Sequence, residues 1–283
     1  MDFFNVRVRK SRAERPTLLF YCQHSLGMGH LVRSLALAGG LSESFRVVLL
    51  NGGPLPKGIR VPEGIEVIDL PPLGFDASGE LVSRDGRRTV ERAKGLRRQI
   101  ILETFRALRP ELLLVELFPF GRKKFSGELM PLLEETQEGR VTRSRPLVVC
   151  SLRDILVGRR EKQEKHDERA ARLANDYFDA ILVHSEPAFA RLEESFHPQT
   201  PLGIPVHYTG FVLPERGIEE GARAHRRARR VIVSAGGGLV GGRLLNTAVE
   251  AHALLLRAGE AVEMEIVAGP FLPEEAWQAL RRA

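Results

Sequence analysis

The chain has 283 residues, of which 43% are hydrophobic and 28% are charged. This is the composition of a globular protein, and it excludes a disordered or fibrous chain. At roughly 100–200 residues per domain, the length fits two α/β domains. Aromatic residues make up 6% of the sequence, so stacking surfaces for single-stranded nucleic acid are scarce, and no nucleic-acid-binding motif is present. We therefore expect no nucleic-acid partner.

The charge balance is basic, with 42 Lys and Arg residues against 36 Asp and Glu residues and a formal net charge of +6. The excess is mostly arginine, whose planar fork matches the geometry of phosphate groups. A preference for phosphorylated ligands or for an anionic lipid surface is one interpretation, and a generally basic protein is the other. Peripheral contact with a membrane therefore stays open.

Cysteine usage and the N-terminal sequence indicate a cytoplasmic protein. Cys22 and Cys150 each end an apolar run, and two buried thiols suit a reducing compartment. The apolar run from Thr17 to Cys22 is far shorter than a signal-peptide core or a membrane span. No Cys and His spacing typical of a metal site is present, so we expect neither a metal nor a cofactor.

Short apolar runs alternate with longer amphipathic segments along the first part of the chain. Strands are expected near residues 18–22, 46–50, 65–70, 112–116, 147–150 and 180–183, and helices near residues 31–41, 88–108, 128–138 and 161–175. Strands that are apolar throughout and alternate with helices are typical of a parallel sheet covered on both faces.

Two local patterns in this part carry weaker expectations. Ser185, two residues before Pro187, predicts the start of a helix. The acidic pairs Asp167-Glu168 and Glu193-Glu194 are expected on the solvated faces of polar helices.

Prolines and glycines interrupt residues 195–230, which we interpret as a connection between domains. The earlier pattern then restarts, with strands near residues 231–233 and 262–268 and helices near residues 243–257 and 273–282. We expect a first domain at residues 1–212, a linker at 213–228, and a second domain at 229–283 that is too short to be complete.

The strongest local signal is Gly27-Met28-Gly29-His30, which follows the first strand and opens the first helix. Ligands of open α/β sheets bind at the carboxyl ends of strands, where glycines allow close approach and a helix N-terminus offers unpaired N–H groups. The positive potential there disfavours a second proton on His30, and a neutral imidazole can act as a general base. A tight turn without a ligand is the alternative. The loop lacks the third glycine of the dinucleotide fingerprint, which argues against a nicotinamide cofactor.

A second glycine-rich turn, Ser234-Ala235-Gly236-Gly237-Gly238, also lies between a strand and a helix. Small residues there can admit a diphosphate against the helix N-terminus without the help of a metal ion. A flexible turn without a ligand is the alternative.

Two further strand ends carry polar residues that the topology directs to the same cleft as His30. One end has Glu116 and Arg122, and the other has Arg153 and Asp154. Either carboxylate could orient a sugar hydroxyl or His30, and either arginine could bind an anionic group. Helix caps and local ion pairs are the alternative.

Together these motifs resemble a known superfamily. The stretch from Leu26 to Ala38 resembles the first glycine loop and helix of MurG-like glycosyltransferases of the GT-B fold, and also the loop of related nucleotide-sugar hydrolases. Similarity to a bacterial group of predicted glycosyltransferases extends to residues 118–122, 151–154 and 208–212, and the turn at 236–238 with Asn246 is similar to the start of the donor-binding domain.

The resemblance implies a GT-B-like α/β fold with two Rossmann-like parallel-sheet domains, the second of them incomplete. The first domain would bind an acceptor that the sequence does not identify, with His30 as the base, through Gly27, Met28, Gly29, Glu116, Arg122, Arg153 and Asp154. The second would bind the diphosphate of a UDP-linked sugar donor through Ser234, Gly236, Gly237, Gly238 and Asn246.

The function that follows is the inverting, metal-independent transfer of a hexosyl or N-acetylhexosaminyl group from a nucleotide-sugar to an acceptor hydroxyl. Hydrolysis of the nucleotide-sugar, with water in place of the acceptor, is one alternative. A truncated, inactive relative that only binds a ligand is the other, because the later part of the family's donor domain is expected to be missing from this sequence.

Overall fold

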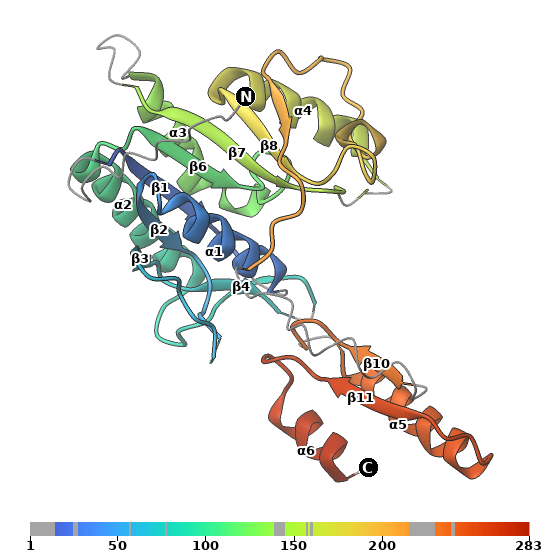
Figure 1. Cartoon of the computed structure of the whole chain (residues 1–283). Coiled ribbons are helices and arrows are strands. Elements are labelled where there is room, and N and C mark those ends of the chain that lie inside the picture. Colours follow the sequence, from blue (N-terminus) through green and yellow to red (C-terminus); the bar gives the residue numbers. More distant parts are fainter. Residues whose placement is uncertain are drawn as a thin grey trace, which may run out of the picture.

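The computed structural model describes residues 15–24, 28–56, 58–76, 78–138, 145–156, 158, 161–214, 230–238 and 241–282. Its main feature is a sheet of seven strands in the order β3-β2-β1-β6-β7-β8-β9, in which every neighbouring pair is parallel (Figure 1). The strands are β1 (Thr17–Cys22), β2 (Arg46–Asn51), β3 (Ile65–Asp69), β6 (Leu112–Glu116), β7 (Leu147–Arg153), β8 (Ala180–His184) and β9 (Val206–Tyr208).

Helices connect most of these strands. They are α1 (Gly29–Leu41), α2 (Val90–Leu108), α3 (Ser126–Glu138) and α4 (Gln163–Tyr177), with short 3-10 helices η2 (Lys123–Phe125) and η3 (Leu192–Glu194). A small antiparallel hairpin, β4 (Leu73–Phe75) and β5 (Leu81–Ser83), precedes α2. None of the described helices is long and apolar enough to cross a membrane.

The apolar strands are buried on both faces of the sheet, as their composition predicts. Alternate residues of β1 serve two cores: Leu18, Phe20 and Cys22 pack with α1, whereas Leu19 and Tyr21 belong to the core that includes residues of α2, α3 and α4. Side chains of a strand point alternately to opposite faces, so one apolar run supplies both cores.

The strand order places one edge of the sheet in a special position. From β1 the chain runs outward through β2 to β3, then crosses back to β6 on the other side of β1. In doubly wound sheets, ligands bind outside the carboxyl ends of the strands at the point where the order reverses. Here that point lies between Cys22 at the end of β1 and Glu116 at the end of β6.

A separate two-stranded sheet follows in the sequence. β10 (Arg230–Ser234) and β11 (Glu263–Val267) pair in parallel through the crossover helix α5 (Gly242–Arg257), and α6 (Glu274–Arg282) comes after them. This confirms the predicted restart of the strand-helix pattern and the α/β class of the chain.

One part of the predicted interdomain connection is wrong. Val206 to Tyr208 forms β9, an edge strand of the main sheet that pairs with Ile181 to Val183 of β8. The strand has only three residues and follows Pro205 directly, so no run of apolar residues marks it in the sequence. Its pairing with β8 makes it a strand.

Two local expectations are also wrong. A turn at residues 187–189 follows Ser185, and η3 begins only at Leu192. Asp167 is buried on α4, where its carboxylate accepts hydrogen bonds from Gln163 Nε2 at 2.7 Å and from the backbone N–H of His197 at 3.0 Å. Because the partner His197 is thirty residues away in the chain, helical periodicity alone does not reveal this role.

Candidate functional site

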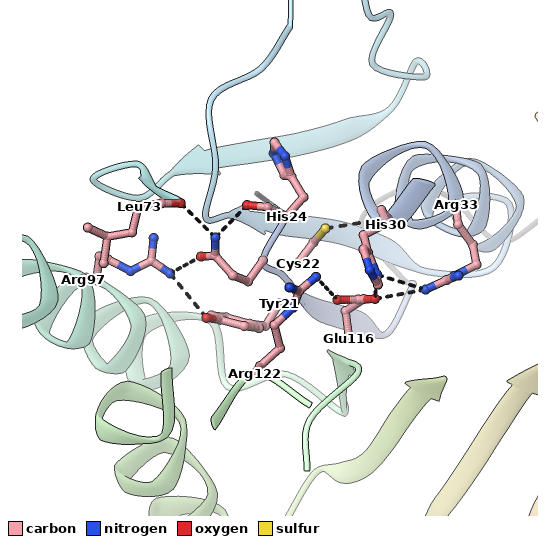
Figure 2. Close-up of polar contacts among 10 residues, drawn as sticks. Tyr21, Cys22, His24, His30, Arg33, Leu73, Arg97, Glu116 and Arg122 are labelled. Atoms are coloured by element: carbon pink, nitrogen blue, oxygen red, sulfur yellow. Dashed lines mark hydrogen bonds and ion pairs between the residues drawn. The ribbon is translucent and has the colours of Figure 1, made fainter. Parts of the chain in front are cut away.

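The centre of the candidate site is a contact between His30 and Glu116, at the reversal point of the sheet. His30 lies in the first turn of α1, whose N-terminus has no side-chain cap and no acidic residue in its first turn. Glu116 is the last residue of β6 and is fully buried. Figure 2 shows the imidazole turned towards the carboxylate, with Nδ1 of His30 in hydrogen-bond contact with Oε1 of Glu116.

Two arginines hold the other positions around this carboxylate. Arg33, one turn further along α1, donates from Nη2 to Glu116 Oε1 at 2.9 Å, and Arg122 donates from Nη2 to Oε2 at 3.4 Å. Burial alone would raise the pKa of Glu116, but the hydrogen bond from His30 and the charges of Arg122 and Arg33 lower it below its usual value. Glu116 is therefore an anion at neutral pH.

An irregular loop after β6 brings Arg122 to this position. Leu117 and Arg122 both have left-handed backbone angles, with φ of 64° and 59°, and the Phe118–Pro119 peptide bond between them is cis. A Cβ atom on Gly121 would lie 2.9 Å from the side chain of Leu117, so only glycine fits this turn without a shift. Left-handed conformations of non-glycine residues are costly and cluster at functional sites.

The hydrogen bonds define the state of His30. An ionised Glu116 can only accept, so Nδ1 of His30 carries a proton, and in the neutral imidazole the lone pair is on Nε2. Nε2 has no hydrogen-bond partner among the described residues, and the side chain is 22% exposed. A buried carboxylate that orients a histidine and stabilises its protonated form is the arrangement that makes histidine an effective general base.

The other predicted residues of this half divide into three groups. Gly27 lies outside the described residues. Met28 occupies the N-cap position of α1 without a capping hydrogen bond, and Gly29 is the first residue of the helix, with open space where a Cβ would be. Arg153 and Asp154 pair with each other at 3.3 Å and form no hydrogen bond or ion pair with His30 or Glu116 within the described residues.

The second predicted cluster surrounds the start of α5. Ser234, Gly236 and Asn246 are exposed, whereas Gly237 and Gly238 are buried against residues 268–272, with the N–H of Phe271 donating to Gly237 O at 2.9 Å. A Cβ on Gly238 would lie 2.3 Å from Ala268 O, but the space beside Gly236 is open. Part of the glycine pattern thus serves the packing of two loops, and only Gly236 leaves open space.

His24 is a site residue that the sequence analysis missed. It lies just beyond β1, fully buried, and its Nε2 contacts Asn51 Oδ1 at 3.1 Å. Asn51 donates its amide hydrogens to Gly53 O and to Asp69, so its oxygen accepts from His24 and the lone pair of His24 is on Nδ1. Burial lowers the pKa of His24, which keeps the ring neutral. Its position directly after an apolar strand is the sequence signal that could have identified it.

An ion pair buried between α2 and α3 supports the carboxyl ends of β1 and β2. Arg97 of α2 is fully buried and donates from Nε and Nη2 to Glu128 of α3, at 2.8 and 2.6 Å. It also donates to Gln23 Oε1 at 2.7 Å and to Gly52 O at 2.8 Å, and thus connects the ends of β1 and β2. Figure 2 shows its contact with the hydroxyl of Tyr21, at 3.3 Å. The sequence signal that Arg97 is buried was its spacing, because the buried residues of α2 recur every four positions: Ala93, Arg97, Ile101 and Phe105.

Comparison with solved structures defines the class of fold. No protein-family model and no curated protein matches the sequence. UGT2 of Phytolacca americana, solved in complex with UDP-2fluoro-glucose and pterostilbene, is similar over 90% of this chain and 72% of its own, with 12% identity and a TM-score of 0.52. The fold is therefore α/β and GT-B-like, as predicted.

Two further solved structures are similar at lower TM-scores. MurG of Acinetobacter baumannii matches over 93% of this chain and 68% of its own, with 13% identity and a TM-score of 0.43. UDP-N-acetylglucosamine 2-epimerase of Rickettsia bellii matches over 95% of this chain and 65% of its own, with 9% identity and a TM-score of 0.47.

Proposed function

We propose that the chain transfers a sugar from a UDP-linked donor to an acceptor hydroxyl, with inversion and without a metal ion. Residues 1–212 would form the acceptor-binding domain, residues 213–228 the linker and residues 229–283 the start of the donor-binding domain. The GT-B fold supports a nucleotide-sugar enzyme, and the UDP-sugar bound in the similar UGT2 structure supports UDP as the nucleotide.

The observation that carries the proposal is the pairing of His30 with Glu116. Glu116 accepts a hydrogen bond from the Nδ1–H of His30, so the lone pair of the neutral imidazole is on Nε2, at a partly exposed position beside the N-terminus of α1. Both residues lie at the reversal point of the sheet, where ligands of this architecture bind.

The reaction follows from this arrangement. His30 Nε2 takes the proton of the acceptor hydroxyl as its oxygen attacks the anomeric carbon of the sugar. The bond from that carbon to the nucleoside diphosphate breaks, and the diphosphate leaves with the electron pair, so the configuration inverts. The Glu116 carboxylate stabilises the protonated His30.

The geometry at the start of α5 supports a binding site there for the leaving diphosphate. The helix has Gly241 as its N-cap, no side-chain cap and no acidic residue in its first turn, so its N–H groups stay available for an anion. Ser234, Gly236 and Asn246 are exposed near this helix start. Backbone N–H groups would take the place of a metal ion in holding the departing charge.

The proposal is tested by following UDP release from UDP-glucose and UDP-N-acetylglucosamine with a panel of hydroxyl acceptors. We expect His30→Ala to lower kcat by about 10²-fold or more while the Kd for UDP stays the same. The control is His207→Ala, which removes an exposed histidine of β9 and should leave the rate unchanged. Near-normal turnover of the His30 variant would exclude it as the base.

Three readouts of the same assay separate the finer parts of the proposal. The anomeric configuration of the product, read by NMR, tests inversion. A chelator should leave the rate unchanged if no metal ion takes part. UDP release that is equally fast without any acceptor would show hydrolysis rather than transfer.

A further inference from the structure

A cavity of about 290 Å³ lies between the loop after β6 and the start of α4. Its floor is apolar and includes Phe118, Ala170 and Leu173. Four cationic side chains line it, and all four residues are exposed: Lys123, Lys162, Lys165 and Arg169. The cavity thus combines an apolar base with a cationic rim.

The cations of this rim have few counter-charges. No ion pair joins any of the four to a carboxylate within the described residues, and the only carboxylate lining the cavity is that of Glu161, which is itself exposed. His166 also lines the cavity but has an interaction of its own. The rim therefore has an excess of positive charge.

The sequence of α4 explains how this excess arises. Residues 162, 165, 169 and 173 recur at helical spacing and share the face that lines the cavity. Two acidic residues of the helix are used elsewhere: Asp167 accepts from the N–H of His197, and Glu168 from the N–H groups of residues 199 and 200. Glu164, in the first turn, does not line the cavity.

This arrangement has an energetic cost in the absence of a ligand. Lys165 and Arg169 are four residues apart on one helix, and like charges at this spacing repel each other and destabilise a helix. The N-terminus of α4 adds positive potential beside them, because its N-cap Lys162 offers no side-chain cap. An anion in the cavity would relieve both repulsions.

We propose that this cavity binds a phosphate ester, with the phosphate on the cationic rim and the organic part on the apolar floor. Arg169 can form a bidentate contact with phosphate oxygens, and the lysines supply point charges. The site is distinct from the His30 centre, although Phe118 of its floor belongs to the loop that carries Arg122. It does not depend on the proposed transfer of sugar.

The test measures binding of glycerol 3-phosphate to the full chain by isothermal titration calorimetry, with glycerol as the uncharged control. The variant K165Q/R169Q removes two rim cations and should weaken binding by about tenfold or more. The matched control is K94Q/R98Q, because Lys94 and Arg98 are exposed, are four residues apart on α2 and carry the same charge. It should bind as the natural chain does. Circular dichroism verifies that both variants fold.

A second arm identifies the source of the phosphate ester. Sedimentation with phosphatidylcholine vesicles, with and without phosphatidylserine, measures binding to a lipid headgroup in the same three proteins. Loss of vesicle binding only in K165Q/R169Q, without binding of soluble ester, would assign the site to a headgroup. Equal loss in both variants would show general charge attraction and overturn the proposal, as would the absence of binding in both arms.

Discussion

Glu116 is the one carboxylate in the centre formed by His30, Arg33 and Arg122, and its charge determines what His30 can do. It accepts hydrogen bonds from the Nδ1–H of His30 and from both arginines while fully buried. The two arginines offset the cost of burying this charge. His30 in turn depends on the carboxylate for its tautomer and for stabilisation of its protonated form.

We therefore predict that Glu116→Gln lowers kcat by about 10²-fold or more, with little change in KM. Glutamine has the shape of glutamate but can present its NH₂ group to Nδ1, which would move the proton of His30 to Nε2 and remove the base. UDP release under saturating donor measures the effect. Glu135→Gln, in the ion pair that α3 forms with Arg106 of α2, is the control. A variant with a raised KM and an unchanged kcat would instead place Glu116 in substrate binding.

Two glutamates of α3 allow the stability contribution of a buried ion pair to be compared with that of a more exposed one. Glu128→Gln leaves the fully buried Arg97 without its charged partner, and removing one member of such a pair costs about 3–5 kcal/mol in the free energy of unfolding. Glu135 pairs with Arg106, which is 62% exposed, so Glu135→Gln should lower the free energy of unfolding far less than Glu128→Gln. Urea unfolding measures both. Equal losses would show that the buried network adds nothing beyond a surface pair.

Single residues also show what the sequence could and could not predict. His30 and Glu116 were expected because a strand end followed by polar residues is visible in the sequence. Arg33, His24 and Arg97 were missed because their partners come from other elements, up to 83 residues away in the case of Arg33 and Glu116. The choice of Glu116 over Asp154 depends on the position of β6 beside β1, which pairing decides.

At the scale of elements, His184 connects three strands of the sheet. It ends β8, contacts Ser151 Oγ of β7 through Nε2 at 2.8 Å, and contacts Thr209 Oγ1, just after β9, through Nδ1 at 2.8 Å. Burial lowers its pKa from 6.5 to about 4. The folded state thus holds His184 neutral where the unfolded chain would protonate it.

We predict a loss of stability on acidification that depends on His184. Between pH 6.5 and about 4 the unfolded state binds the additional proton, so stability is complete above pH 6.5 and falls by on the order of 3 kcal/mol towards pH 4. Urea unfolding at several pH values measures this slope. The variant His184→Gln can keep hydrogen bonds to both hydroxyls but does not titrate, so its slope should be shallower. Identical slopes would contradict the assignment.

Two glycines before α5 are expected to have different roles, Gly238 in packing and Gly236 in ligand binding. Gly238 has φ of +89° and no room for a Cβ, because Ala268 O would lie 2.3 Å away. Gly236 has φ of +58° with open space, so a Cβ there costs only about 1–2 kcal/mol of backbone strain. We predict that Gly238→Ala exposes the amides of β10 and β11 to hydrogen exchange, whereas Gly236→Ala mainly weakens UDP binding. The reverse order would place the ligand at Gly238.

Elements were predictable where local sequence alone determines them. The strands of the main sheet that are five residues or longer follow from apolar runs, which are continuous or nearly so except in β3, where Glu66 interrupts the run, and the helices follow from their spacing. The hairpin β4–β5 and the strand β9 have three residues each, so their pairing partners rather than their own sequence make them strands. The burial of Asp167 likewise depends on a distant backbone N–H group.

For the whole molecule, the order of strands explains why one edge of the sheet carries the site. The chain fills one side of β1 before it crosses to β6, so the first helix and the fourth strand of the sheet meet at the reversal point. His30 and Glu116 lie 86 residues apart in sequence and in contact in space for this reason. The same topology explains why a sequence pattern predicts the members of the site more readily than their pairing.

The seven-stranded sheet packs against two hydrophobic cores, whereas the sheet of β10 and β11 contributes to neither. This difference gives a prediction for the whole chain. Both hydrophobic cores of the described structure are built from residues no later than Tyr208, and Leu213 and Pro214 line a groove along α1. We expect residues 1–214 to fold alone, with cooperative urea unfolding and the circular dichroism of an α/β protein. This fragment should not bind UDP, because the proposed diphosphate-binding site lies after it.

Residues 229–283 should behave differently when expressed alone. Their sheet has two strands, and Val231, Ile232 and Val267 are 41%, 63% and 44% exposed. Two-stranded sheets are marginally stable at best in water. We expect this fragment to lack protected amides in hydrogen exchange, and the full chain to be needed for UDP binding. A fragment 1–214 that aggregates or unfolds without cooperativity would show that the main sheet requires the second unit, and would contradict the proposed division into domains.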